Sequence, residues 1–509
     1  MVYCGKPSKG CENCRTKKIC LGYRDQMDLM FRDENTRTQA RFRQWHARTC
    51  GSASISASNA SSSLLFAADS YVMQVNCATP AFSLSPPTED VVINHFYHTI
   101  LDNLSDEDPV RYLHSQLPNL YASCDPGSAL RLATEAISYA ASRKLVQKAA
   151  LLCRKRYVQA IKAIGQAIQD PTKVGNDQTL YAILLLCGYE TMLRDPSTTL
   201  AWGAHVDGAA ALVKFRGISE AHSSLSRSMF WFVRRNLVLG HMQLCKPVDD
   251  VFSVLDMLAP SQESPEYHLI SKAAEIPNLQ YRSNCMFIQP QDAIKNDVEN
   301  LFHSARALDR EILDWARTVP TTWSYTAAMN ANDLASSDFT PRQVHRYPNI
   351  YIARVWNFYR VSRLIIQSLL TRAISWMSTS MDLNDFDEGG QIEKSSMELV
   401  NDICASVPFL LGYDLTKMKL PSTSGGSKQE RTSRSGIEKN GPARNGRFSL
   451  IWPLHISCSS SSVPQAQRDW MRMQLRFLAN CGEKQAQVVC FTRSQILLGG
   501  IDHDRFDCV

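Results

Sequence analysis

The chain has 509 residues, of which 44% are apolar and 20% charged, a balance that indicates a folded globular protein and excludes a largely disordered one. Its longest apolar run, around Leu180 to Leu193, is interrupted by Glu190. A spanning helix needs about 20 apolar residues, so we expect a buried helix here and no membrane partner. Without an apolar signal core at the N-terminus, the 16 cysteines are expected to be thiols or metal ligands rather than disulfides.

The net charge of +6 is concentrated at the N-terminus. Eleven basic and five acidic residues lie between Met1 and Arg48, so this segment carries the whole net charge and the remainder is neutral. A positive end on a neutral body is typical of a protein that meets a polyanion such as nucleic acid. A solvated basic tail is the other interpretation of the same pattern.

We expect five regions along the chain. Residues 1–48 form a basic, cysteine-bearing head, and residues 49–87 form a Ser-rich flexible linker. Residues 88–420 form a large helical body. Residues 421–447 are a second disordered insert by composition, and residues 448–509 complete the body with a helical part and a tail.

Helical spacing dominates the body. Thr88-Glu89-Asp90 begins its first helix with a capping hydroxyl and acidic first-turn residues. Pro320 ends a later helix of about five turns, whose apolar face is Val298, Leu301, Phe302, Ala305, Leu308, Ile312 and Trp315. Strand-like alternation is scarce, so the sequence predicts an all-α fold of antiparallel helices.

One cysteine cluster lies in the head, with the sequence Cys11-Glu12-Asn13-Cys14 followed by basic residues. Two thiolates with this spacing can hold one face of a tetrahedral zinc ion. Cations on a short helix that starts near the second cysteine could reach phosphates and guanine edges. A redox site is the rival interpretation, but it requires a surrounding βαβ pattern that is missing here.

Cys-x-x-Cys-Arg-x-Lys-Lys resembles the first half of the fungal binuclear zinc cluster, a transcription-factor family in which six cysteines hold two zinc ions. The resemblance implies zinc as cofactor, DNA with a short GC-rich triplet as partner, and the nucleus as location. It implies Cys11, Cys14 and Cys20 as metal ligands, Lys17 and Lys18 as base readers, and Arg15 as a phosphate contact.

The head departs from the family pattern after Cys14. Five residues separate Cys14 from Cys20, whereas the family has six before its third cysteine, and the residues after Cys20 look like those that follow its sixth. A stretch with three cysteines is therefore missing between Ile19 and Cys20. Three thiolates cannot close a four-coordinate zinc site. We expect a disordered head with non-specific DNA affinity, and a single site completed by Cys4 is the alternative.

The body carries a second resemblance, to the regulatory domain of fungal transcription factors. Its motifs are Trp202-x-x-His205-x-x-Gly208-Ala209 ending in Arg216-Gly217, Trp356-Asn357-x-Tyr359-Arg360, and residues 406–412. We expect Gly217 to end its helix in the left-handed conformation. We also expect helices to approach closely at the small residues Gly203, Ala204, Gly208, Ala209 and Ala210. With no Cys or His at ligand spacing, His205 is expected to be a packing residue.

Two functional hypotheses follow, with a third behind them. The first is a DNA-binding regulator of RNA polymerase II transcription in a fungal pathway, whose helical domain binds an effector, a coregulator or a homo- or heterodimer partner. The second is a protein-interaction or dominant-negative module without specific DNA binding. A helical enzyme is the third, but GxSxG, phosphate-loop, HExxH and dinucleotide motifs are absent from the sequence, so we expect no enzyme.

Overall fold

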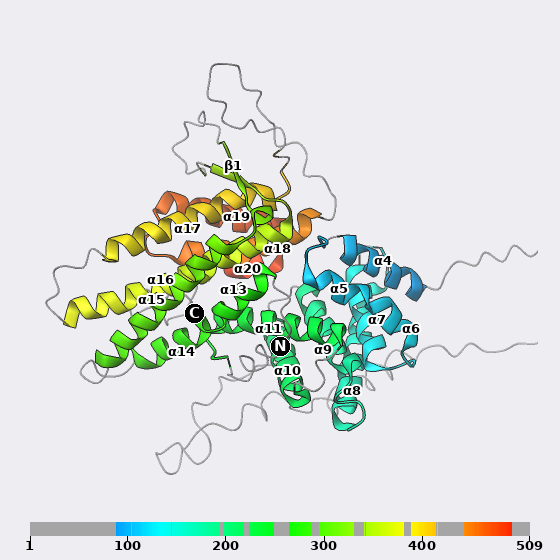
Figure 1. The fold of residues 1–509 in the computed structure, drawn as a ribbon. Coiled ribbons are helices and arrows are strands. Elements are labelled where there is room, and N and C mark those ends of the chain that lie inside the picture. The colour runs from blue at the N-terminus through cyan, green and yellow to red at the C-terminus, as the bar shows by residue number, and fades with distance from the viewer. Residues whose placement is uncertain are drawn as a thin grey trace, which may run out of the picture. The chain divides into compact units, whose positions relative to one another are not determined.

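The computed structural model describes residues 88–102, 104–143, 145–193, 198–217, 223–248, 264–287, 295–329, 341, 343–380, 388–413, 415 and 442–490. All of them belong to one compact unit, Leu84–Val509. Helices make up most of this part of the chain, so the predicted all-α class is confirmed (Figure 1). The five-region division remains a prediction; within it, α18 begins at Pro442, inside the range assigned to the second insert.

The first group of helices encloses its own hydrophobic core. Helix α7 lies at the centre of this core and packs against α4, α8 and α9. Phe96, Ala133 and Leu186 are fully buried there. The group consists of α4 (Thr88–Asp102), α5 (Pro109–Ser115), α6 (Leu117–Ser123), α7 (Ala129–Ala141), α8 (Ala149–Gln169), α9 (Asp177–Leu193), α10 (Thr198–Arg216) and α11 (Ser224–Leu244).

The second group packs around the long helix α16, which contacts α14, α15, α17 and α18. Its core contains several aromatic side chains, including Trp315 and Trp376. The group consists of α13 (Pro265–Ala273), α14 (Ile276–Met286), α15 (Lys295–Thr318), the 3-10 helix η3 (Thr321–Trp323), β1 (Thr326–Met329), β2 (Gln343–Arg346), α16 (Ile350–Ser380), α17 (Glu388–Leu410), α18 (Pro442–Ser459), α19 (Gln465–Asn480) and α20 (Lys484–Val489).

Helix α11 contributes to both cores. Met229 and Val233 lie in the first core, and Val238 and Met242 lie in the second. A further link comes from Asp108, which is buried. Its side chain accepts a hydrogen bond from the Val110 amide at the start of α5. The same carboxylate pairs with Arg354 of α16 at 3.0 Å. The two groups are therefore joined by a shared helix and an ion pair.

The spacing argument for α15 is confirmed. All seven residues of its predicted apolar face are buried, and Pro320 follows the helix directly before η3. Helix α9, the longest apolar run, is buried around most of its circumference, including Glu190, which is 3% exposed. Among the described residues, no helix is both long and apolar enough to cross a membrane.

A small antiparallel sheet was not predicted. Strands β1 and β2 pair Thr326 with Arg346 and Met329 with Gln343, and β2 packs against α17. Four-residue strands give too little alternation to be recognised from spacing, and only Val344 and His345 of β2 are buried.

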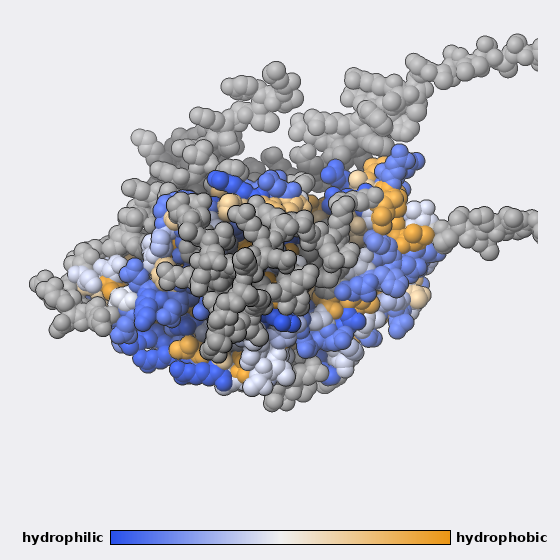
Figure 2. All heavy atoms as spheres, turned by 90° about the horizontal axis from the view of Figure 1, so that it is seen from above, coloured by the Kyte–Doolittle hydropathy of each residue, from blue (hydrophilic) through white to orange (hydrophobic). Residues whose placement is uncertain are grey.

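Figure 2 shows that hydrophilic residues cover most of the described surface on the face it presents, and hydrophobic residues gather there in small patches. Scattered exposed apolar residues are normal on a folded protein. The larger apolar side chains are concentrated in the two cores instead.

Two glycines are expected to respond to alanine in opposite directions. At Gly446 on α18 an added Cβ would overlap the carbonyl oxygen of Leu410 and lie 3.0 Å from its carbonyl carbon, so Gly446→Ala should destabilise the protein by about 1–3 kcal/mol. At Gly165 on α8 the Cβ meets nothing within 4 Å, so Gly165→Ala should stabilise by about 0.5–1 kcal/mol. Urea unfolding of the full chain measures both, and shifts of the same sign would contradict the packing at Leu410.

Candidate functional site

The residues predicted for zinc and DNA lie outside the described residues. They are Cys11, Cys14 and Cys20 for the metal and Arg15, Lys17 and Lys18 for DNA, together with the alternative ligand Cys4. Their roles therefore remain predictions. Among the described residues, no group of three or more His, Cys, Asp or Glu side chains is arranged to hold a metal ion.

A buried arginine organises the N-terminal half of α16. Arg360 is 0% exposed, and its Nη1 donates hydrogen bonds to Tyr347 Oη at 2.7 Å and to Asn357 Oδ1 at 2.8 Å. Its Nε lies 3.5 Å from Asp402 Oδ2 on α17. A buried guanidinium is tolerated when it is paired and hydrogen-bonded. The contacts of Nη1 and the ion pair with Asp402 meet that requirement in part, whereas Nη2 has no hydrogen-bond partner. We call Arg360, Tyr325, Tyr347, Asn357 and Asp402 the Arg360 cluster.

Aromatic rings surround the same guanidinium. Its carbon lies 5.1 Å from the ring centroid of Tyr325, 5.8 Å from that of Tyr347 and 5.9 Å from that of Trp356. A cation over such rings gains about 0.5–2 kcal/mol per contact, and more as water is excluded. The rings come from the segment around β1 and β2 and from α16, so Arg360 fastens this small sheet to the long helix.

The electrostatics of the cluster favour a charged Arg360 paired with Asp402. Burial alone would lower the pKa of Arg360, but Tyr347 and Asp402 hold the pKa above its ordinary value. His345, whose Nδ1 lies 3.2 Å from Tyr347 Oη, has its pKa lowered to about 3 by burial and by Arg360. Burial raises the pKa of Asp402, although Arg360 opposes that rise. The cluster is largely buried and its charged groups are paired, which indicates a structural role.

Two motifs of the second resemblance, Trp356–Arg360 and residues 406–412, meet around this cluster. Trp356 Nε1 donates to the carbonyl oxygen of Trp323 at 2.9 Å, and Asn357 donates to Ser406 Oγ at 2.9 Å. One turn later Arg363 donates to both carboxylate oxygens of Asp309, each at 2.8 Å. One packed site therefore depends on residues that lie about 100 positions apart in the sequence, such as Asp309 and Ser406.

The motif on α10 behaves partly as predicted. His205 Nε2 lies 3.1 Å from Tyr157 Oη, and burial lowers its pKa to about 4, so it is a neutral packing residue. Gly217 has φ +64° and ends the helix in the left-handed conformation, as predicted.

The prediction of close helix approach on α10 holds for Ala209 and Ala210, which are buried where α10 packs against α9. It was wrong for Gly203 and Gly208, where a Cβ would meet nothing within 4 Å. A close approach also occurs at Gly240 of α11, where a Cβ would lie 3.1 Å from the ring of Trp202.

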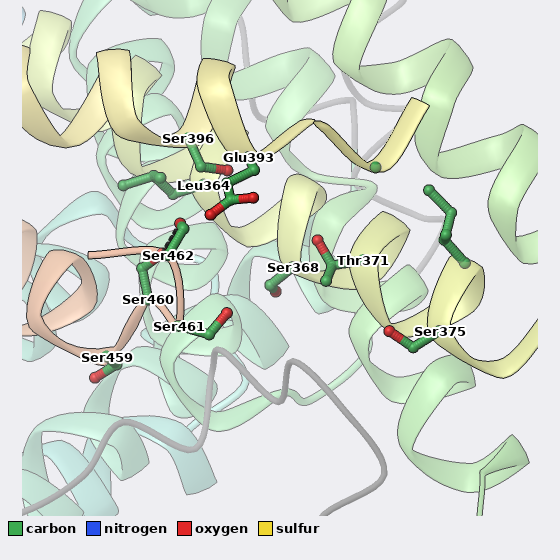
Figure 3. Close-up of a pocket in the computed structure, with 12 residues that line it drawn as sticks. Leu364, Ser368, Thr371, Ser375, Glu393, Ser396, Ser459, Ser460, Ser461 and Ser462 are labelled. Carbon is green, nitrogen blue, oxygen red and sulfur yellow. Dashed lines mark hydrogen bonds between the residues drawn. The ribbon is translucent and has the colours of Figure 1, made fainter. Parts of the chain in front are cut away.

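A pocket of about 450 Å³ lies farther along α16. Figure 3 shows its lining residues on α16, on α17 and on the segment that leaves α18. Leu364 and Ile374 supply apolar surface, Gly389 backbone and Glu393 a carboxylate. The other eight lining residues share a hydroxyl group: Ser368, Thr371, Ser375, Ser396, Ser459, Ser460, Ser461 and Ser462.

Sequence reasoning missed this pocket. The run from Ser459 to Ser462 was the only local signal, and such a run is equally typical of a loop. The other lining residues are spaced along two helices, so the pocket exists only once α16, α17 and α18 pack together. Its size falls within the range of about 300–1,000 Å³ that is usual for small-molecule sites.

Residues 71–239 match the family model of the fungal specific transcription factor domain. The chain is also similar to transcription factor dbaG of Emericella nidulans, with 23% identity over 328 residues that cover 63% of this chain and 71% of that protein. No solved structure matches. Residues 71–239 are therefore similar to the regulatory domain of fungal transcription factors. Both matches are to transcription factors rather than enzymes, in agreement with the prediction of a non-enzymatic regulator.

Proposed function

We propose that this chain regulates transcription of a fungal pathway from the nucleus and that its helical region is the regulatory part. The observation that supports this is the match of the fungal specific transcription factor domain to residues 71–239, which include the first core from α4 to α10 and most of α11. The similarity to a second fungal transcription factor extends over 328 residues, beyond the domain itself.

The finer proposal is that the head contacts DNA through a zinc-bound turn. Zinc would be held by Cys11, Cys14 and Cys20 together with a fourth ligand such as Cys4, and the adjacent Arg15, Lys17 and Lys18 would meet phosphates and guanine edges. Without a closed zinc site, the expected affinity is that of a basic segment for the phosphate backbone.

Genome occupancy of the tagged full chain in a fungal host tests direct binding, with expression profiling of the deletion strain beside it. We expect occupancy without promoter preference that is lost in the triple variant Arg15→Ala, Lys17→Ala and Lys18→Ala. It should be kept in Arg317→Ala, a control at an exposed arginine of the helical body. Occupancy no higher than that of the tag alone would contradict direct DNA binding. Altered transcripts without occupancy would favour the second candidate below.

A second candidate function, an interaction module, is favoured by the outer face of α8. Leu151, Val158, Ile161 and Ile168 are 43–69% exposed and lie within about 100° of one another around the helix axis. Exposed basic residues flank them, among them Lys162, and α8 contains no acidic residue. Two copies of such a face would repel each other. We infer that it docks an acidic amphipathic helix of a partner protein.

Fluorescence anisotropy tests this docking with a labelled synthetic helical peptide that carries leucine on one face and glutamate on the other. Ile161→Glu is expected to weaken binding by about tenfold or more, as the loss of one buried anchor does. Gln166→Glu, which adds the same charge on the same helix away from the apolar face, should leave binding unchanged. Equal losses in the two variants, or equal binding of a lysine-for-glutamate peptide, would contradict the proposed partner.

A further inference from the structure

The hydroxyl-lined pocket is built from three segments that are far apart in the chain. α16 supplies Leu364 to Ser375, α17 supplies Gly389 to Ser396, and the end of α18 with the following residues supplies Ser459 to Ser462. Figure 3 shows the labelled side chains of these segments converging on one space. None of the pocket residues belongs to residues 71–239, the part that matches the regulatory domain.

Four of the eight hydroxyls of the pocket present oxygen lone pairs rather than hydrogens. Ser368 donates to the Ile365 carbonyl at 2.7 Å, and Thr371 donates to the Gln367 carbonyl at 2.9 Å. Ser459 donates to the carbonyl of its own helix four residues earlier, and Ser396 donates to the Gln367 side-chain oxygen. Each hydroxyl has one hydrogen and two lone pairs. With the hydrogens already used, the surface is an acceptor surface that suits a ligand rich in N–H donors.

The charge of the pocket lining also favours a ligand with N–H donors, in particular a cationic one. Glu393 is exposed, and in Figure 3 its carboxylate faces the space between α17 and the Ser460–Ser462 segment. No Lys, Arg or His is among the residues that line the pocket. The N-terminus of α17 adds a partial positive charge of roughly half a unit, but Glu388 lies in that first turn and pairs with Arg306. The full negative charge of Glu393 therefore dominates.

We propose that this pocket binds a small cationic amine. An ammonium group of the ligand pairs with Glu393, its remaining N–H groups donate to the hydroxyl oxygens of α16 and α17, and its methylene groups contact Leu364 and Ile374. A charge-assisted hydrogen bond of this kind is stronger than a neutral one. A neutral polyol could donate to the same oxygens but has no charge to pair with Glu393, and an anion would be repelled by the carboxylate.

Isothermal titration of the full chain at physiological salt tests the proposal, with spermidine as the cationic probe and sorbitol and inorganic phosphate as neutral and anionic probes. Saturable binding is expected for spermidine alone. Glu393→Gln should weaken it by about tenfold, the usual effect of removing one charge-assisted contact, whereas Glu398→Gln, the same change at another exposed position of α17, should leave it unchanged.

A second variant separates the pocket from general attraction of a polycation to the surface. Ser368→Leu adds carbon to the lining without changing any charge, and it should reduce spermidine binding while circular dichroism remains that of the parent. Equal binding by the Glu393 and Glu398 variants would overturn the proposal, because the cation would then be held elsewhere. A preference for phosphate or sorbitol, or no saturable binding of spermidine, would overturn it as well.

Discussion

Replacing Arg360 with methionine is expected to lower the free energy of unfolding by about 3–5 kcal/mol, the range found when one partner of a buried charged network is removed. Methionine keeps most of the volume but donates no hydrogen bond. Tyr347 Oη and Asn357 Oδ1 would lose their donor, and Asp402 would lose its guanidinium. Three aromatic rings would lose their cation at the same time.

Urea unfolding of the full chain, followed by tryptophan fluorescence, measures this change. The matched control is Arg317→Met on α15, because that side chain is 72% exposed and pairs only with Asp314 of its own helix; its loss should cost less than about 0.5 kcal/mol. Arg360→Lys should be intermediate, since lysine keeps the charge but not the fork of donors. If Arg360→Met and Arg317→Met behaved alike, the cluster would not be holding the sheet to α16.

Lowering the pH from 7 to 5 is expected to cause the second large change in the free energy of unfolding. Burial lowers the pKa of His114, His205 and His455 to about 4 each, and burial together with Arg360 lowers that of His345 to about 3. In the unfolded chain these histidines titrate near 6.5, so the unfolded state binds more protons below that pH. The stability they contribute is complete above pH 6.5 and is lost as the pH falls toward 4. The loss by pH 5 is about 1–2 kcal/mol for each histidine.

The free energy of unfolding, measured in urea at pH 7, 6 and 5, is therefore expected to fall by about 4–8 kcal/mol over this interval for the four histidines together. His205→Gln should reduce the slope by the equivalent of one proton, since glutamine can still meet Tyr157 but does not titrate. His268→Gln, at an exposed position of α13, should leave the slope unchanged. A free energy of unfolding that stays constant between pH 7 and pH 5 would contradict this, because it would mean that these histidines take up protons in the folded state as readily as in the unfolded chain.

Features that repeat at helical spacing could be predicted from the sequence. Seven apolar positions fixed the buried face of α15 because each turn of a helix returns to the same side. Gly217 could be assigned to a helix end because few other residues adopt a positive φ there. His205 could be placed in the core because it lacked a metal partner nearby.

Features that depend on distant segments could not be predicted. Arg360 was recognised only as part of a motif, since no local pattern shows that Tyr347, 13 residues earlier, and Asp402 on α17 will close around it. The pocket needs three helices in place before its hydroxyls face one space. The direction of the glycine-bearing face of α10 was also wrong, because small residues are compatible with either a contact or an exposed surface.

Helix α11 belongs to both cores, and the region that matches the regulatory domain ends within it, at residue 239. A boundary drawn from sequence similarity therefore divides a single helix, just after Val238, the first α11 residue that packs into the second core. A shift of α11 along its axis by a fraction of a turn would disturb side-chain packing on both sides at once, because close-packed interiors do not deform gradually. The region with the family match and the region with the pocket thus constrain each other mechanically through this one helix.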